Sequence, residues 1–145
     1  MNVIVSYSGI IDRCKLLSAF DARESLTASG ERNFKQMKVT EQEKELLTLY
    51  IGQACNAVAS ALSYAIADVI VGDDHAKFRI TERHSAENKT ISLKKSIEET
   101  IVAYTLQRWY EDKSPERSKA YNALYTDMLK STKALAYKSE KPVLA

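Results

Sequence analysis

The sequence predicts a mainly α-helical protein: a helical bundle of about four helices, with one long central helix and a small β-hairpin insertion. Three observations lead to this fold class. Apolar residues recur every three or four positions over long stretches, as they do on the buried face of a helix. Glycine and proline are scarce, with four and two copies among 145 residues, which disfavours an all-β fold with many tight turns. The composition is 45% hydrophobic and 28% charged, which is typical of a globular protein, and we expect a single helical domain over residues 1–145.

The first helix is expected over residues 8–23. Its apolar positions keep helical spacing. They are Tyr7, Ile10, Ile11, Cys14 and Leu17. The next stretch, residues 24–34, is rich in small and polar residues and contains Gly30, so we interpret it as a loop.

The long central helix is expected over residues 41–71, which corresponds to roughly 45 Å at 1.5 Å per residue. Thr40 and Glu43 have the spacing of a capping box at its start. Gly72 suits the left-handed cap at its end. The middle of this helix is rich in small residues such as Gly52 and Ala54, which either reflects high helix propensity or allows neighbouring helices to approach closely.

Apolar residues then switch to a period of two, which predicts a β-hairpin over residues 76–93. Phe78 and Ile80 alternate with polar residues in the first run, and Ile91 and Leu93 do so in the second. The intervening "HSAEN" resembles a turn. An irregular loop that leads into the next helix is the alternative interpretation.

Two further helices are expected, one from residue 92 or 93 to residue 112 and one that begins at Pro115 after the capping residue Ser114. Apolar rows indicate that the first of these helices is central and that the second packs as one side of an antiparallel pair. The short turn between them would let Trp109 pack against the returning helix. We therefore expect three core anchors, namely Trp109, Tyr121 and Leu124. Residues 139–145 are expected to form a C-terminal tail.

The sequence contains none of the common catalytic motifs or metal-binding spacings. The two histidines, His75 and His84, have no cluster of acidic residues or cysteines around them at metal-site spacing. Cys14 and Cys55 lie within helical patterns and suit buried, reduced thiols. We therefore expect no enzyme activity, no catalytic residue, no cofactor and no metal. Neither a signal peptide nor a membrane-spanning stretch is predicted.

Positive charge gathers around the predicted hairpin, although the formal net charge of the chain is only +2. The residues concerned are Lys77, Arg79, Arg83, Lys89, Lys94 and Lys95. Four more cations line the end of the last helix, namely Lys130, Lys133, Lys138 and Lys141. These lysines and arginines either keep the surface soluble or form a surface for a phosphate backbone or an acidic protein partner.

The C-terminal half resembles the head-to-tail adaptor or connector proteins of tailed bacteriophages, which form the neck ring. The resemblance rests on an amphipathic helix that ends in Trp109-Tyr110, a turn with Pro115-Glu116, a last helix with spaced Tyr and Leu, and a Lys141-Pro142 tail. The order of helices in the first half is also similar. The predicted hairpin departs from the simplest adaptors.

The resemblance implies a virion structural protein of the neck or tail, made in the host cytoplasm, that performs no chemistry. Such proteins form a ring of identical copies, often twelve-fold, beneath the portal protein. They join the portal to other neck or tail proteins and extend the channel through which genomic DNA passes; no membrane is involved. The candidate partner interface comprises the hairpin and the terminal segment, which in this family docks on the portal: Phe78, Arg79, Ile80, Arg83, Lys138, Lys141, Pro142, Val143 and Leu144.

Other functions remain compatible with the residues. A small helical DNA-binding or regulatory module would bind DNA tightly and with strong salt dependence through the basic residues near the hairpin. Another helical interaction protein, such as a tail-completion factor, a cargo protein or a host-takeover protein, would share the same fold class.

Overall fold

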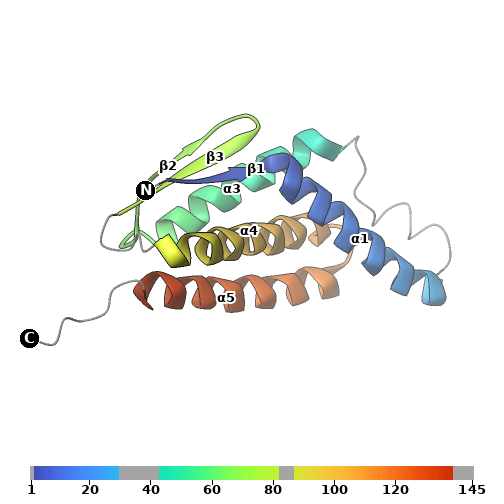
Figure 1. Cartoon of the computed structure of the whole chain (residues 1–145). Coiled ribbons are helices and arrows are strands. Elements are labelled where there is room, and N and C mark those ends of the chain that lie inside the picture. The colour runs from blue at the N-terminus through green and yellow to red at the C-terminus, as the bar shows by residue number, and fades with distance from the viewer. Residues whose placement is uncertain (1, 30–42, 82–86, 139–145) are drawn as a thin grey trace, which may run out of the picture.

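The computed structural model describes residues 2–29, 43–81 and 87–138, with side chains for residues 2–21, 43–81 and 91–136 (Figure 1). Within them, four helices accompany a three-stranded antiparallel sheet, which confirms the predicted mainly α fold class with a small β element. The order of elements is β1 (Asn2–Ser6), α1 (Tyr7–Ser29), α3 (Lys44–Ala61), β2 (Ile66–Val71), β3 (His75–Ile80), α4 (Glu87–Tyr110) and α5 (Pro115–Lys138).

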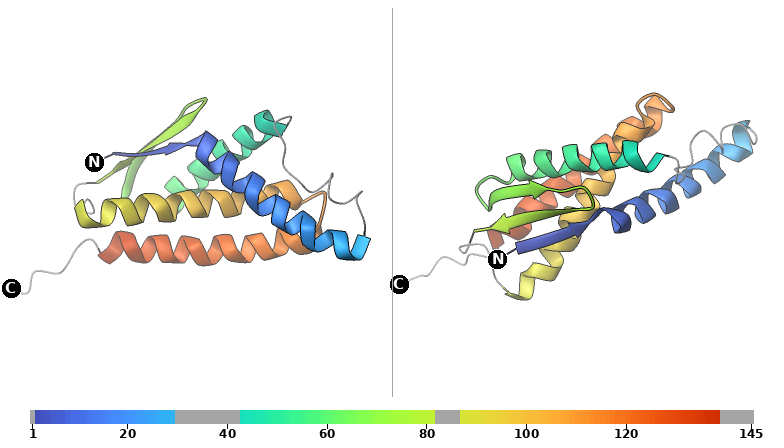
Figure 2. Two further views of the ribbon diagram at one scale, coloured as in Figure 1. Left: turned by 45° about the vertical axis from the view of Figure 1, so that its right-hand side comes forward. Right: turned by 90° about the horizontal axis from the view of Figure 1, so that it is seen from above.

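The sheet has the strand order β1-β3-β2, so the N-terminal strand lies beside the third strand of the chain. β2 and β3 form a hairpin, in which the Gly72 N–H donates a 2.9 Å hydrogen bond to the His75 carbonyl. β1 pairs with the other side of β3, and Val3 lies opposite Phe78. Both pairings are antiparallel, and Figure 2 shows the three strands as one layer over the helices.

Alternation of side chains gives the sheet one buried face and one open face. The buried face carries Val3, Val5, Ala76, Phe78 and Ile80. α3 packs against β2 and β3, and α4 packs against β1, so these two helices cover that face. This packing provides the burial that such a small sheet needs for stability.

α4 is the central helix, because it packs against α1, α3, α5 and β1. Its two apolar rows are buried, as the wide stripe in the sequence predicts. They include Leu93, Ile97, Ile101, Val102, Leu106 and Trp109. α5 returns along α4 after a short turn (Figure 1), and the Arg117 N–H donates to the Ser114 side-chain oxygen at 3.4 Å, which confirms the predicted cap.

The prediction of one helix over residues 41–71 is wrong, because α3 ends at Ala61 and the chain turns into β2. The end of the predicted helix is rich in β-branched residues, and pairing with β3 satisfies their backbone groups in a strand instead. Gly72 accordingly lies in the hairpin turn and caps no helix. A side chain there would come within 2.9 Å of the His75 carbonyl oxygen. Thr40 and with it the predicted capping box lie outside the described residues, and Glu43 occupies the N-cap position of α3.

The predicted hairpin over residues 76–93 is also wrong in its extent. Its first run is β3, but the partners of β3 are β1 and β2. Its second run lies within α4, which begins at Glu87. The first helix likewise begins one residue earlier than expected and continues to Ser29, into the stretch interpreted as a loop. One partner of β3 is β1, at the opposite end of this part of the chain, so local periodicity did not identify that pairing.

The small residues of α3 allow close packing against β2. A side chain at Gly52 would lie 3.4 Å from Val71, and Ala54 is fully buried. The close neighbour at Gly52 is therefore a strand of the sheet, where the sequence suggested another helix.

Candidate interaction surface

The face of the sheet that points away from the helices is open to solvent, and we call it the open sheet face. Its residues follow from the strand registers and from the alternation of buried and exposed positions. They are Asn2, Ile4 and Ser6 on β1, His75, Lys77 and Arg79 on β3, and Asp68 and Ile70 on β2. No described helix or strand covers this face (Figures 1 and 2).

Two isoleucines flank a lysine in the middle of the open sheet face. Ile4 and Ile70 lie opposite Lys77 on either side of β3, and they are 51% and 62% exposed. Lys77 makes no ion pair with a described carboxylate. Exposed apolar side chains next to an unpaired cation favour contact with a protein partner over exposure to water.

The next row of paired residues across the open sheet face is polar. Arg79 pairs with Asp68 at 2.7 Å between Nη2 and Oδ2, and both side chains are about half exposed. Together with Asn2, Ile70 and Lys77 they line a shallow depression of about 240 Å³. An exposed ion pair of this kind contributes little to stability, about 0–1 kcal/mol. Its guanidinium and carboxylate therefore remain accessible to a partner.

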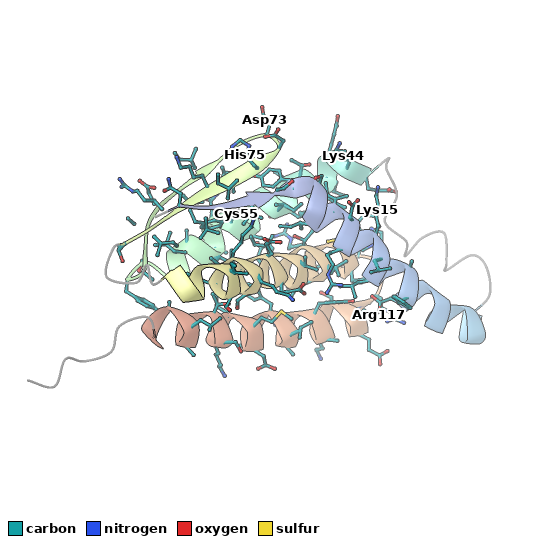
Figure 3. The ribbon with its side chains drawn as sticks, in the orientation of Figure 1. Lys15, Lys44, Cys55, Asp73, His75 and Arg117 are labelled. Carbon is teal, nitrogen blue, oxygen red and sulfur yellow. The ribbon has the colours of Figure 1, made fainter. Side chains whose placement is uncertain are left out.

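The hairpin tip, where Asp73 and His75 are labelled in Figure 3, carries an exposed contact between a histidine ring and a carboxylate. His75 Nδ1 lies 2.6 Å from Asp74 Oδ1, and the carboxylate side chain is 89% exposed. No group of three or more metal-ligating side chains comes together anywhere in the described residues. No helix of the described segments has both the length and the apolar character that a membrane crossing requires.

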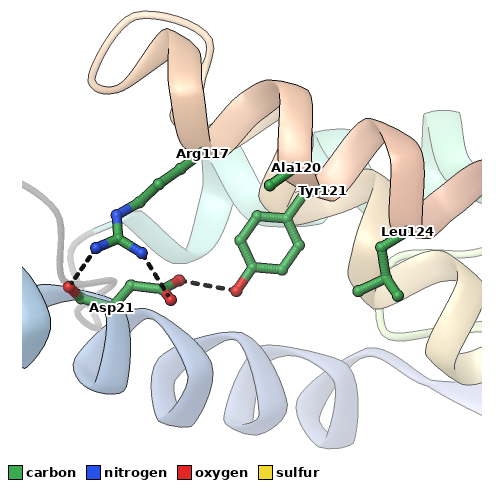
Figure 4. Close-up of a pocket in the computed structure, with 5 residues that line it drawn as sticks. All are labelled: Asp21, Arg117, Ala120, Tyr121 and Leu124. Atoms are coloured by element: carbon green, nitrogen blue, oxygen red, sulfur yellow. Dashed lines mark hydrogen bonds and ion pairs between the residues drawn. The ribbon is translucent and has the colours of Figure 1, made fainter.

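A second polar cluster ties α1 to the α4–α5 pair (Figure 4). The hydroxyls of Tyr110 and Tyr121 each donate to Asp21 Oδ2 at 2.8 Å. Arg117 donates to Asp21 Oδ1 at 3.0 Å and to the Asp21 carbonyl at 2.9 Å. The two tyrosine rings stack with centroids 5.6 Å apart. The cluster joins three helices and is largely buried, which indicates a structural role.

The electrostatics of this cluster favour neutral tyrosines. Burial raises the pKa of Tyr110 well above its usual value, and the hydrogen bond to Asp21 raises it further. The pKa of Tyr121 is raised by the same two causes in the same order. A shallow depression of about 210 Å³ adjoins the cluster, lined by Asp21, Arg117, Ala120, Tyr121 and Leu124. Both terminal nitrogens of the Arg117 guanidinium already donate to Asp21. The Arg117 charge is therefore not available to a ligand in this depression.

Three buried groups elsewhere are held in their neutral form. Burial raises the pKa of the Cys14 and Cys55 thiols to about 12 each. Both cysteines are free and buried, which confirms the expectation of reduced, buried thiols. The pKa of Tyr7 is raised to about 12, first by burial and then by nearby Cys55, Asp73 and Asp74. The Tyr7 hydroxyl is buried without a hydrogen-bond partner.

The structure corrects part of the predicted partner interface. Phe78 and Ile80 are 0% and 2% exposed and belong to the core, so they cannot contact a partner on this surface. Arg79 does lie on the open sheet face, because it alternates with these two residues along β3. Lys138 ends α5 without a described side chain. The other five residues of the predicted interface lie outside the described residues: Arg83, Lys141, Pro142, Val143 and Leu144.

The three predicted core anchors occupy different environments. Trp109 is 3% exposed, and Lys113 Nζ lies 3.8 Å from the centroid of its ring. Tyr121 is partly buried, but its stacking partner is Tyr110. Leu124 is 39% exposed, so its prediction as a core anchor is wrong: it lines the shallow depression next to Tyr121.

Sequence reasoning missed two important residues. Ile4 belongs to the run Asn2–Ser6, whose alternation of valine with other residues is a strand signal, but five residues are too few to distinguish a strand from a helix start. Asp21 has no recognisable sequence signal, because its tyrosine partners are 89 and 100 residues away.

Comparison with known proteins identifies no relative: no protein-family model, no curated protein and no solved structure matches this chain.

Proposed function

We propose that the chain is a structural subunit of a bacteriophage head-to-tail connector, which assembles into a ring, joins the portal to the tail and extends the DNA channel. The family named in this proposal is based on the resemblance of the α4–α5 segment to neck ring proteins. The observation that carries the proposal is the presence of two separate exposed apolar patches. One is the pair Ile4 and Ile70 on the open sheet face, and the other is the pair Leu16 and Phe20 on α1.

The second patch has the geometry of a helix surface contact. Leu16 and Phe20 are four residues apart, so they share one face of α1, and they are 50% and 54% exposed. A ring of identical subunits is closed by contacts between two different surfaces of each subunit. The open sheet face of one copy and the α1 patch of the next would provide such a pair.

The surface charge is compatible with a protein that surrounds DNA without gripping it. The formal net charge is +2, and Arg79 is already paired with Asp68. Tight binding to a phosphate backbone needs many unpaired cations, since each phosphate contact releases counterions. A channel subunit with few such contacts would let the genome slide past.

Light scattering of the purified full chain, alone and mixed with the portal protein of the same genome, tests the proposal. We expect a ring-sized particle, at least when the portal is present. Ile70→Glu and Phe20→Glu should each prevent ring formation, because burying a carboxylate in an apolar contact is costly. A mixture of the two variants should stop at small open complexes, since each variant retains one intact surface.

Leu124→Glu is the matched control, because Leu124 is an exposed apolar residue outside both patches. This variant should assemble like the original chain. A chain that stays monomeric with the portal, or rings that ignore both patch variants, would refute the proposal. Gel shifts at low and physiological salt separate the main alternative, since tight and salt-sensitive DNA binding would instead indicate a regulatory module.

A further inference from the structure

β1 is an edge strand, and its outer peptide groups have no partner among the residues that the structure describes. The Tyr7 N–H donates to the Asp74 carbonyl at 3.0 Å, so residue 7 is a hydrogen-bonded position of the β1–β3 ladder. In an antiparallel pair these positions alternate, which places Val3 and Val5 in the ladder and turns Asn2 and Ile4 outward. No described backbone group bonds to the outward N–H and C=O groups of Asn2 and Ile4.

The β1 edge lacks the features that protect most edge strands. Such edges commonly carry a lysine, a proline or a bulge, or are covered by another element. The sequence of β1 is NVIVS, and its pairing with β3 has no register shift. The opposite edge is different, because β2 has a register irregularity between Ile66 and Asp68. The β1 edge is therefore suited to accept another strand.

The residues around the β1 edge indicate which kind of strand could be added there. The first turns of α4 lie below and beyond this edge (Figures 1 and 2), and α4 packs against β1. Ile91 is 80% exposed there. Lys94 and Lys95 are also exposed, and neither they nor Lys77 form an ion pair with a described carboxylate. Lys77 thus lies opposite Ile4 on the neighbouring strand, and the helix segment near the edge carries an exposed isoleucine and two exposed lysines.

We propose that β1 accepts an extended, acidic segment of a partner protein as a fourth strand of the sheet. Its backbone would bond to Asn2 and Ile4, its apolar side chains would cover Ile4 and Ile91, and its carboxylates would lie near the unpaired lysines. This is the recognition mode in which main-chain hydrogen bonds give affinity and side chains give specificity. A second copy of the chain would bring the same lysines to the edge, and like charges oppose that pairing. The inference does not depend on the connector role.

The test uses the full chain and a fluorescent, capped peptide of alternating valine and glutamate, matched in length to β1. A peptide with lysine in place of glutamate is the control. We expect the acidic peptide to bind at least about tenfold more tightly than the basic one, with an affinity that falls as salt rises. Amide hydrogen exchange should show that Ile4 becomes protected on binding, whereas Val3 and Val5 are already protected in the free protein.

Ile4→Pro removes the outward N–H of the edge without removing a bond of the β1–β3 ladder. It should weaken the acidic peptide by roughly five- to tenfold, which corresponds to one lost hydrogen bond. Ile4→Thr is the matched control, because it keeps the N–H and a high strand propensity while it removes the apolar side chain. Ile4→Thr should therefore weaken binding less than Ile4→Pro.

Equal binding of the two peptides, no binding, or unchanged exchange at Ile4 would overturn this inference. Self-association of the free chain that Ile4→Pro abolishes, but that Ile4→Thr and Ile70→Glu leave intact, would also overturn it, since a second copy would then occupy the strand edge. The exchange measurement requires no variant, so it stands even where Ile4→Pro fails to fold. Ring assembly is measured separately through Ile70 and Phe20, so failure of one proposal is distinguishable from failure of the other.

Discussion

Replacing Asp21 with alanine tests how firmly α1 is tied to the α4–α5 pair. The substitution leaves the Tyr110 hydroxyl buried without an acceptor, since this residue is 0% exposed. Such a loss costs about 2 kcal/mol. The lost bond from the half-buried Tyr121 adds about 1 kcal/mol. Arg117 retains no carboxylate partner at Asp21, but its side chain is 22% exposed and water can replace part of the bond.

The free energy of unfolding should therefore fall by about 3 kcal/mol, which corresponds to a decrease in Tm of roughly 10 °C for a chain of this size. Urea unfolding followed by circular dichroism measures the free energy, and calorimetry measures Tm. Asp12→Ala is the matched control, because Asp12 is an exposed carboxylate on the same helix. Its effect should stay within about 0.5 kcal/mol.

A double-mutant cycle isolates the contact itself. In a Tyr110→Phe background the ring remains and the hydroxyl is gone, so Asp21→Ala should cost about 1–2 kcal/mol less than in the original chain. An Asp21→Ala effect below about 1 kcal/mol, or equal to that of Asp12→Ala, would show that the cluster does not stabilise the fold.

Two further predictions concern buried titratable groups. The pKa of Tyr7 is raised to about 12 in the folded protein, against about 10 when unfolded, so the unfolded state loses its proton first as pH rises. Stability is therefore intact below pH 10 and should fall by about 1.4 kcal/mol per pH unit from this group between about pH 10 and 12. Tyr7→Phe should make alkaline unfolding less steep and should be neutral or slightly stabilising at pH 7, because it removes an unpaired buried hydroxyl; a loss of more than about 1 kcal/mol at pH 7 would contradict this reasoning. The Cys14 and Cys55 thiols, whose pKa values are raised to about 12, should resist a thiol reagent such as DTNB at pH 8 and react once the chain is unfolded in guanidinium. Rapid reaction of either native thiol would show that the packing around it opens readily.

The sequence by itself determined the features that depend on neighbouring residues. Helical spacing, the Ser114 cap and Pro115 placed the α4–α5 pair, and the alternation along residues 76–80 placed β3. Local backbone preferences and side-chain periodicity act over a few residues, so a single sequence displays them directly.

Only the tertiary structure decided which segments meet. The run after Ala61 is compatible with either a helix or a strand, and it becomes β2 because its backbone pairs with β3 while Ile66 and Val69 pack against the core. Asn2–Ser6 becomes β1 because the residues of β3, about seventy positions later in the chain, pair with it. Asp21 likewise accepts hydrogen bonds from two tyrosines that lie 89 and 100 residues later in the chain. Such choices depend on burial and hydrogen bonding between distant segments, which local propensity does not encode.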